Sequence, residues 1–220
     1  ITQKLLESKP AVLYVPLHIL CQDPTFTQSI VSYANVCAVL PRVVTDRELP
    51  QLRQDMLNVK AMGVHEVLIG NVGLIIPVRE CGLRARGDFG LNLYNSGAVN
   101  CARDLLLRSA CLSFEMTLPQ IRDVSKAVPC EILGYGRLPL MITENCVIQG
   151  RTGQCSCHLA PAKLTDKTGA EFPIIRDGNS CRSVLLNGKK LNLLDRREDL
   201  SRLGLWSLRL YFTTENPREV

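Results

Sequence analysis

The sequence of 220 residues is 46% hydrophobic and carries a net charge of +5, which suits one large globular domain, or one domain with an appended lobe. No run approaches the roughly 18 apolar residues that a membrane-spanning helix needs, so we expect no membrane insertion. The basic excess lies in residues 151–202, with ten Lys and Arg against six Asp and Glu. It favours a polyanionic partner only weakly, because a solvated surface lobe has the same composition.

Short apolar strands alternate with helical segments as far as residue 135. We predict strands at residues 11–16, 36–40, 66–70, 84–95, 110–115 and 130–135. Residues that favour helix starts stand between them: Asp23 with Pro24, Asp46, Ser96 and Thr117. The helices that they cap are predicted to run to about residues 34, 62, 108 and 127. An earlier helix, within residues 2–9, ends before Pro10.

This alternation predicts parallel β/α units, and the nearly continuous apolar strands fit burial on both faces. No glycine-rich phosphate loop follows a strand, so the α/β fold expected is a TIM-like (β/α) barrel rather than an open doubly wound sheet. Residues 206–212 predict a seventh strand that returns to the main sheet. Because a closed barrel needs eight, we expect it to be incomplete within this segment. The chain starts at Ile1 rather than Met, so we expect a longer parent protein with further domains.

The regular pattern stops at Cys146. We therefore divide the chain into β/α barrel units (residues 1–145), a cysteine-containing basic insertion lobe (146–203), and a returning strand with a tail (204–220). Inside the lobe, short strands are predicted at residues 164–166, 172–175, 183–186 and 191–194. Asn187-Gly188, between the last two, is the strongest hairpin signal in the chain.

The chain has ten cysteines, which fall into two groups. Six are scattered among apolar neighbours and are interpreted as free thiols that act as small hydrophobic residues: Cys21, Cys37, Cys81, Cys101, Cys111 and Cys130. Four are candidate metal ligands within 36 residues: Cys146, Cys155, Cys157 and Cys181. Four thiolates suit an iron–sulfur cluster or zinc equally in number, and a metal-free site is the third possibility. Their spacing is not that of the paired C-x2-C zinc hairpins.

Polar residues follow several of the predicted strands, where a β/α barrel has its mouth. We expect a site there that suits a small anionic or amide-rich ligand, with Asn92, Glu115 and Arg137 as catalytic candidates and Asn95 and Tyr135 as cofactor-binding candidates. The alternative is that several of these residues only cap the helices that follow. No G-x-S-x-G or H-E-x-x-H motif supports conventional hydrolysis.

Three sequence blocks carry a resemblance to a known family. They are the segments from Glu131-Ile-Leu-Gly-Tyr-Gly136 to Cys146, Leu164-Thr-Asp-Lys-Thr-Gly169-Ala-Glu-Phe-Pro173, and Cys181-Arg-Ser-Val-Leu-Leu-Asn187. The upstream segments Gly87-Asp-Phe-Gly-Leu-Asn92 and Leu112-Ser-Phe-Glu115 look like further family blocks. Over about residues 10–212 the chain resembles the collagenase-like peptidase family U32, and in particular the barrel of its long multi-domain members.

The resemblance implies a TIM-like barrel with a cysteine-bearing insertion near its mouth. Members of the family hydroxylate tRNA, ribosomal RNA or quinone precursors without oxygen. Several hold a [4Fe-4S] cluster on four cysteines, and prephenate is implicated as a co-substrate. The present sequence departs from the family signature: counted from Glu131, the first signature cysteine falls on Pro139 and the second on Cys146. The extra thiol of the Cys155–Cys157 pair is the candidate replacement.

We carry three functional hypotheses forward. The first is a cytoplasmic iron–sulfur domain of an RNA-hydroxylating protein, with the four clustered cysteines as iron ligands and RNA as partner. The second is a peptidase, as the family name says, although no nucleophile and base can be assembled from the sequence. The third is a non-catalytic barrel that supports other domains of the parent chain.

Overall fold

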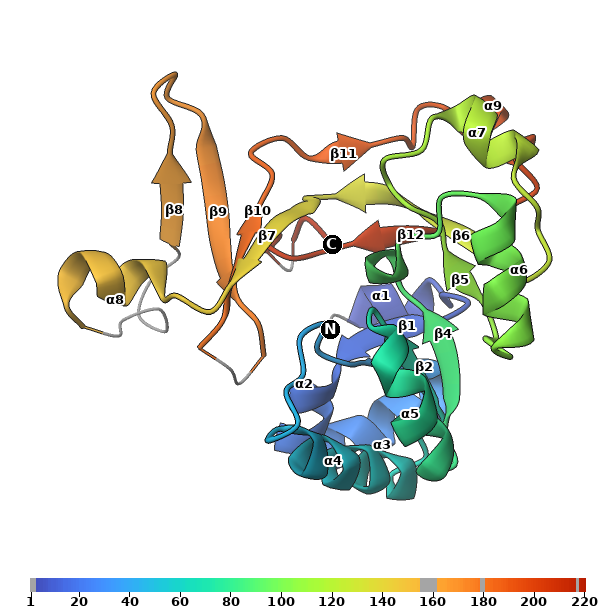
Figure 1. Cartoon of the computed structure of the whole chain (residues 1–220), viewed down its shortest axis with the longest axis horizontal. Helices are drawn as coiled ribbons and strands as arrows, with labels where there is room; N and C mark the ends of the chain where they lie inside the picture. The colour runs from blue at the N-terminus through green and yellow to red at the C-terminus, as the bar shows by residue number, and fades with distance from the viewer. Residues whose placement is uncertain (1–2, 155–161, 179–180, 217) are drawn as a thin grey trace. The chain divides into compact units, whose positions relative to one another are not determined.

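The first strands of the computed structural model form a parallel sheet whose order follows the chain (Figure 1). The structure describes residues 3–154, 162–178, 181–216 and 218–220. Each neighbouring pair in this series is parallel. The strands are β1 (Leu13–Pro16), β2 (Val36–Val39), β3 (Glu66–Ile69), β4 (Arg84–Gly87), β5 (Ala110–Cys111) and β6 (Cys130–Gly136).

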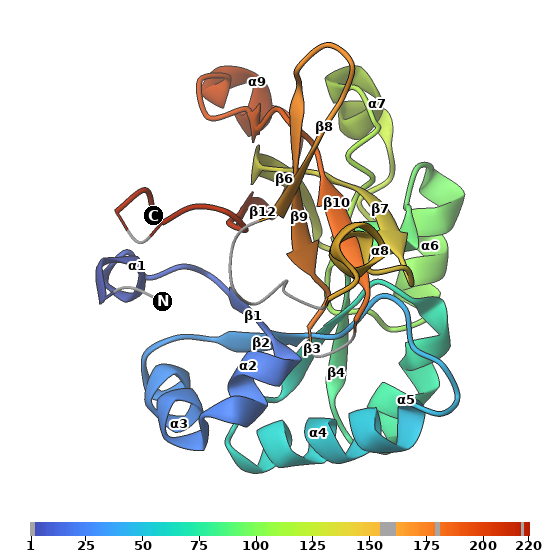
Figure 2. The same ribbon diagram turned by 90° about the vertical axis from the view of Figure 1, so that its left-hand side faces the viewer.

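Helices connect these strands and cover the outer side of the sheet, which curls as a half-barrel (Figure 2). They are α2 (Leu17–Gln22), α3 (Pro24–Tyr33), α4 (Leu49–Ala61), α5 (Ile75–Glu80), α6 (Ser96–Asp104) and α7 (Leu118–Asp123), with 3₁₀ turns η1 (Val72–Leu74) and η2 (Phe89–Leu91). A further helix, α1 (Gln3–Glu7), precedes β1. The predicted mixed α/β fold with parallel β/α units is confirmed, and the half-barrel fits a partial barrel.

The apolar spacing of the helices explains how they pack. In α4 the buried side chains are Leu52, Met56 and Val59, which recur at intervals of three or four residues and so form one stripe. Val67 and Ile69 of β3 are fully buried as well. Burying each such side chain stabilises the fold by about 1.5–3 kcal/mol, so the layer of helices on sheet holds the core.

Helix starts follow the predicted chemistry at two of four positions. Asp23 Oδ1 accepts a hydrogen bond from Phe26 N at 2.9 Å, and Thr117 forms a capping box with Gln120. The Ser96 prediction is wrong, because the side chain of Asn95 caps α6.

The prediction of Asp46 as a helix cap is also wrong. Helix α4 begins two residues later, with Glu48 as its N-cap, and the Glu48 carboxylate instead accepts hydrogen bonds from Thr45 N at 2.7 Å and Thr45 Oγ1 at 2.8 Å.

Several predicted strands and helices are shorter in the structure. The strand expected at 84–95 ends at Gly87, because η2 follows and Asn92 adopts a left-handed backbone with φ of 49°. The strand expected at 110–115 is limited to Ala110–Cys111, and the helix expected to reach residue 127 ends at Asp123. Helices α2 and α5 were not predicted.

The chain is divided between two compact units, which are described separately. Unit 1 comprises Ile1–Leu133 and Arg196–Arg209, and unit 2 comprises Gly134–Asp195 and Leu210–Val220. Unit 1 therefore also contains α9 (Arg197–Ser201) and most of β12 (Ser207–Tyr211).

Strand β12 confirms the predicted return to the main sheet, since it pairs with β6. At its start, Trp206 N donates to Cys130 O at 2.8 Å, and at its end Tyr211 lies against Gly136. The two strands therefore run in the same direction.

Unit 2 contains a four-stranded antiparallel sheet in the order β7-β10-β9-β8. Its strands are β7 (Pro139–Thr143), β8 (Ala162–Thr165), β9 (Glu171–Arg176) and β10 (Ser183–Leu186), with α8 (Val147–Thr152) after β7. Strand β7 was not predicted. The strands expected at 164–166, 172–175 and 183–186 are found with small shifts of their ends.

The hairpin predicted at Asn187-Gly188 is wrong. Both edges of β10 are already occupied by β7 and β9, so the short strand β11 (Leu191–Asn192) pairs instead with the end of β6. None of the described helices is long and apolar enough to cross a membrane.

Gly136 gives a test of the β6–β12 pairing. Its φ is 124°, and a Cβ at this position would collide with the carbonyl oxygen of Tyr211. Gly136→Ala should therefore cost about 2 kcal/mol or more in unfolding free energy, measured by urea denaturation with circular dichroism.

Gly153→Ala is the matched control, because Gly153 also has a positive φ (73°) but, among the described residues, has nothing within 4 Å of the added carbon. It should cost only about 1 kcal/mol. Equal losses in the two variants would show that no close strand contact exists at Gly136.

Candidate functional site

The inner side of the half-barrel carries charged and polar side chains. The interior of a closed β/α barrel is usually filled by Val, Ile and Leu, so charges at these positions need a reason. In unit 1 the buried polar side chains are Thr27, Glu66, Arg86, Asp88, Ser109, Ser113, Glu131 and Arg209. Most of them form two connected networks.

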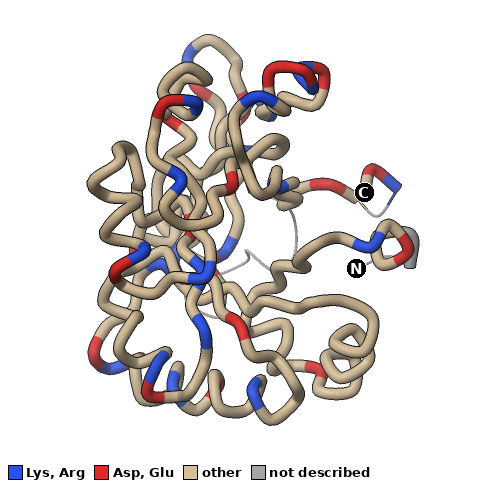
Figure 3. Tube along the Cα trace, turned by 90° about the vertical axis from the view of Figure 1, so that its right-hand side faces the viewer, with Lys and Arg blue, Asp and Glu red and all other residues tan. Residues whose placement is uncertain are grey.

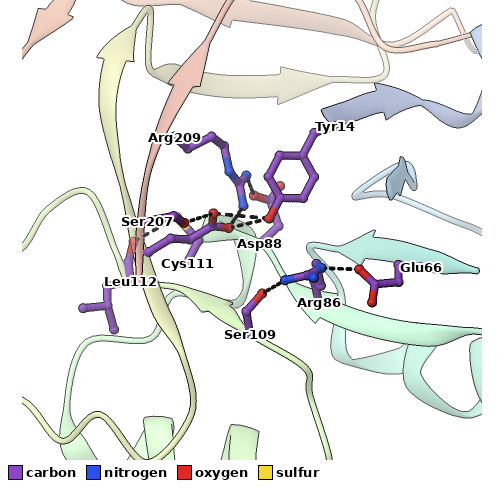
Figure 4. A network of polar contacts seen from close by, with 10 residues as sticks. Tyr14, Glu66, Arg86, Asp88, Ser109, Cys111, Leu112, Ser207 and Arg209 are labelled. Carbon is purple, nitrogen blue, oxygen red and sulfur yellow. Dashed lines mark hydrogen bonds and ion pairs between the residues drawn. The ribbon is translucent and has the colours of Figure 1, made fainter. Parts of the chain in front are cut away.

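Arg209 lies at the centre of the larger network (Figure 4). Its Nη1 donates to Asp88 Oδ1 at 2.5 Å, and its Nη2 donates to Glu131 Oε1. The guanidinium carbon lies 4.3 Å from the centre of the Tyr14 ring, and the residue is only 6% exposed. One cation thus connects β12 with β6, with β1 and with the residue that follows β4.

Glu131 is the most buried member, at 1% exposure. Besides Arg209, its carboxylate accepts hydrogen bonds from Tyr14 Oη at 3.1 and 3.2 Å and from Ser207 Oγ at 3.2 Å. Charge-assisted bonds of this kind are about twice as strong as neutral ones. Side chains of β1 and β12 therefore hold the carboxylate in one orientation.

Burial and neighbouring charges fix the protonation states. Burial, and then the Glu131 carboxylate, raise the pKa of Tyr14 far above its ordinary value, so Tyr14 stays a hydrogen-bond donor. Burial lowers the pKa of Arg209, but its neighbours raise it by a larger amount, so Arg209 stays protonated. These neighbours are Cys111, Asp88, Glu131 and Tyr14. The network therefore holds one permanent cation, Arg209, between two buried carboxylates.

Arg209 also retains an unused donor. Among the described residues, its buried Nε has no hydrogen-bond partner. Leaving such a group unpaired costs about 1–3 kcal/mol, which a bound water or a ligand oxygen would recover. The Nε of Arg209 can therefore donate to a neutral acceptor, such as a water or a carbonyl oxygen.

The smaller network surrounds Glu66 at the start of β3. Arg86 Nε donates to Glu66 Oε2 at 2.7 Å, and Arg86 Nη1 donates to Ser109 Oγ at 2.8 Å (Figure 4). Two further arginines, Arg84 and Arg108, approach the same carboxylate at 3.4 and 2.8 Å.

The candidates predicted at the barrel mouth in unit 1 follow the expected strands but stay apart chemically. Asn92 and Glu115 are exposed, and Asn95 Oδ1 accepts a hydrogen bond from Ala98 N at 2.9 Å as the cap of α6. In the described part of the chain, no hydrogen bond joins the side chains of these three residues. Their roles in catalysis and cofactor binding remain predictions.

Tyr135 and Arg137 lie in unit 2, where both make structural contacts. Arg137 Nη1 donates to Asn187 O at 3.0 Å and to Gly188 O, which holds the turn after β10. The Tyr135 ring packs on Phe212 with centroids 5.6 Å apart, and its hydroxyl lies 3.3 Å from Lys190 Nζ.

The four candidate metal ligands are only partly described. Cys155 and Cys157 lie outside the described residues. Cys146 and Cys181 are free thiols in unit 2, and Cys146 Sγ accepts a hydrogen bond from Gln149 N at 3.4 Å. Within the described ranges, no group of three or more potential ligands is assembled.

The register of the unit 2 sheet nevertheless brings two of these thiols to one end. Ser183 of β10 pairs with Thr143 of β7, so Cys181 and Cys146 both lie just beyond that pair. Arg182 Nε donates to Glu144 Oε1 at 2.5 Å at the same end. Pro139, where the family signature has a cysteine, pairs with Leu186 at the opposite end of the ladder.

The six scattered cysteines are free thiols, as predicted. Cys37, Cys81, Cys111 and Cys130 are buried, and burial raises the pKa of Cys130 to about 11. Cys101 departs from the prediction, because it is exposed on α6. Protonated, buried thiols are poor nucleophiles, which leaves the buried group a packing role.

The geometry so far defines an α/β half-barrel protein with a buried charge network and a cysteine-bearing unit. The family model for peptidase family U32 matches residues 28–218, which is most of the chain. The chain therefore belongs to peptidase family U32. No curated protein matches the sequence.

The sequence predictions did not single out the Arg209 network. One signal was present: in Ser207-Leu-Arg209-Leu-Tyr211, polar side chains alternate with leucines, as on a strand with one polar face. Asp88 and Glu131 both stand in segments that resemble family blocks. That these residues meet depends on pairing between distant segments.

Arg209→Met tests the energetic role of the network. It would leave the Asp88 and Glu131 carboxylates buried without their cation, so the unfolding free energy should fall by about 3–5 kcal/mol. The measurement is urea denaturation followed by the fluorescence of Trp206, the sole tryptophan of the chain, which lies in unit 1.

The control is Arg196→Met, which removes an exposed ion pair with Asp199 (2.8 Å) and should cost less than about 1 kcal/mol. A loss below about 1 kcal/mol in Arg209→Met itself would mean that the buried contacts do not hold β12.

Glu215 predicts a pH dependence in unit 2. Burial raises the pKa of Glu215, but hydrogen bonds from Thr213 N and Lys190, among others, lower it by a larger amount. The pKa of Glu215 therefore lies below its ordinary value. Because the pKa of Glu215 is lower in the folded than in the unfolded protein, the ionised carboxylate stabilises the fold at pH values above its unfolded pKa of about 4.3. This stabilisation is lost as the pH falls through the folded pKa.

Glu215→Gln should therefore destabilise the protein at pH 7, and the difference from wild type should vanish in acid. Thermal unfolding at several pH values checks this, with Glu115→Gln, at an exposed position, as control. A difference between Glu215→Gln and wild type that persists unchanged in acid would contradict the assignment.

Proposed function

We propose that this chain is the cysteine-bearing barrel segment of a cytoplasmic, oxygen-independent hydroxylation protein that acts on RNA and uses an iron–sulfur cluster. Membership of family U32 supports the proposal. In the same proposal the half-barrel is part of a TIM-like barrel, to which other domains of a longer parent chain contribute.

The observation that carries the proposal is the position of Cys146 and Cys181. Two free thiols that are 35 residues apart in the chain come to one end of the β7–β10 ladder. Thiolates are the usual ligands of iron–sulfur clusters, so the donor chemistry at this end fits. The proposed ligands are Cys146, Cys155, Cys157 and Cys181.

The Pro139 substitution is consistent with this ligand set. Pro139 lies at the far end of β7 from Cys146. A cysteine there would lie about 3.3 Å farther for each strand residue from the end where the two described thiols lie. The Cys155–Cys157 pair is therefore the proposed source of the remaining ligands.

A bound four-iron cluster would supply one-electron chemistry. The residues of the chain would hold it: Cys146 from the start of α8, and Cys181 from the loop before β10. The Glu144–Arg182 ion pair braces that end of the ladder. Prephenate is the proposed co-substrate, on the ground of family membership alone.

Metal analysis after anaerobic purification tests the ligand set. The wild-type protein should carry about four iron atoms per chain and absorb visible light. Cys146→Ser and Cys181→Ser should lose most of this iron, whereas Cys101→Ser, which removes an exposed thiol of unit 1, should retain it.

Two outcomes of that analysis would overturn the cluster: a colourless protein with all ten thiols titratable, or a protein that holds zinc alone. The RNA assignment is measured separately. Mass spectrometry of nucleosides from cells that lack the gene should show the loss of a hydroxylated nucleoside, and an unchanged nucleoside profile would contradict it.

A further inference from the structure

A cluster of arginines lies at the amino-terminal ends of neighbouring strands in unit 1. Glu66 begins β3, Arg84 begins β4, and Arg108 stands two residues before β5. Together with Arg86 they make a set of three guanidinium groups around one buried carboxylate. Three positive charges against one negative charge leave a local excess of two.

The three arginines are not equivalent. Arg86 is 3% exposed and donates to Glu66 and Ser109 inside the half-barrel. The side chains of Arg84 and Arg108 are 60% and 54% exposed. Arg108 contacts Glu66 through its Nε at 2.8 Å. The excess charge is therefore presented by two half-exposed guanidinium groups.

The tryptophan of the chain joins this cluster. Trp206 immediately precedes β12 and is 44% exposed. The guanidinium carbon of Arg86 lies 5.1 Å from the centre of its ring, which fixes one side of the indole. Its backbone N donates to Cys130 O at the start of β6. The residues Arg84, Arg108 and Trp206 thus stand on the rim formed by the starts of β4, β5 and β12.

Charge along most of the trace is mixed, with lysine and arginine interspersed with aspartate and glutamate (Figure 3). Arg103 and Arg122, for example, each pair with the aspartate that follows them. Residues 151–202 add a diffuse excess of ten Lys and Arg over six Asp and Glu. The rim differs because Arg84 and Arg108 share the single carboxylate of Glu66, which is already paired with a third arginine.

We propose that this rim binds single-stranded nucleic acid, with a backbone phosphate held by Arg84 and Arg108 and a base stacked on Trp206. Guanidinium groups bind phosphate oxygens in a bidentate manner, and exposed indole rings stack on bases of any sequence. An acidic peptide offers no ring to the indole, and a duplex keeps its bases paired. That the strand is RNA rests on the proposed function.

The test uses the full chain and a fluorescently labelled oligoadenylate, with anisotropy measured at several salt concentrations. Binding should quench Trp206. Arg84→Gln and Arg108→Gln should each lower the slope of log K against log salt by about 0.7, as expected when one phosphate contact to a single strand is lost. Trp206→Leu should weaken binding about fivefold or more, and Trp206→Phe by less.

The matched control is Arg47→Gln, which removes one exposed positive charge from the loop after β2 and should leave the slope unchanged. Circular dichroism checks that each variant is folded. Equal slopes in Arg47→Gln, Arg84→Gln and wild type would overturn the proposal. If polyglutamate binds as tightly as the oligoadenylate, the rim is a surface for acidic peptides and the proposal is wrong. If duplex RNA binds as tightly, no base stacks on Trp206 and that part of the proposal is wrong.

This titration needs no metal, so it separates the two proposals. If the purified protein holds no iron but the rim variants lose affinity for the oligonucleotide, the rim proposal stands and the iron–sulfur cluster is ruled out. If the protein holds iron and its loss abolishes an RNA modification, but the rim variants bind like wild type, the proposed function stands and the rim proposal is ruled out.

Discussion

The structure of unit 1 depends on a buried cation that is paired with two carboxylates. Arg209 meets Asp88 and Glu131, which are 121 and 78 residues away in the chain. Removing three charges from water is costly, so such a network does not by itself add stability. It acts through the cost of mispairing, because any other strand beside β6 would leave both carboxylates without a cation. The network thereby selects β12 as the strand that returns.

This selection matters because the chain leaves unit 1 and comes back. It enters unit 2 at Gly134, returns at Arg196 and leaves again after Arg209. Strands β6 and β12 both continue from one unit into the other, and both carry a member of the network. Unit 2 in turn presents Cys146 and Cys181 through the register of β7 and β10. Unit 1 thus carries the Arg209 network, and unit 2 carries the two described candidate thiols.

Much of the fold could be predicted from the sequence, because short apolar runs between helical segments form the buried strands of a parallel sheet. The starts of β2 to β6 and the ends of β1, β2, β3 and β6 were predictable for this reason. The ends of β4 and β5 were not: β4 stops at Gly87 because the following residues form a 3₁₀ turn and Asn92 takes a left-handed backbone. The hairpin prediction at Asn187-Gly188 was wrong because a turn signal depends only on the local sequence. The strand edge with which β11 could pair was that of β6. The meeting of Arg209 with Asp88 is long-range, and no local pattern contains it.

The interior and the rim of the half-barrel use charge differently. Arg209 is enclosed and matched by carboxylates, whereas Arg84 and Arg108 share Glu66 and face solvent. The first arrangement determines which strands pair, and the second is available to a partner. The claim that Arg209 determines the pairing is tested most directly by a double-mutant cycle of Arg209→Met and Glu131→Gln, read by Trp206 fluorescence in urea. A coupling free energy of about 2 kcal/mol or more is predicted, and a value below about 0.5 kcal/mol would contradict the account.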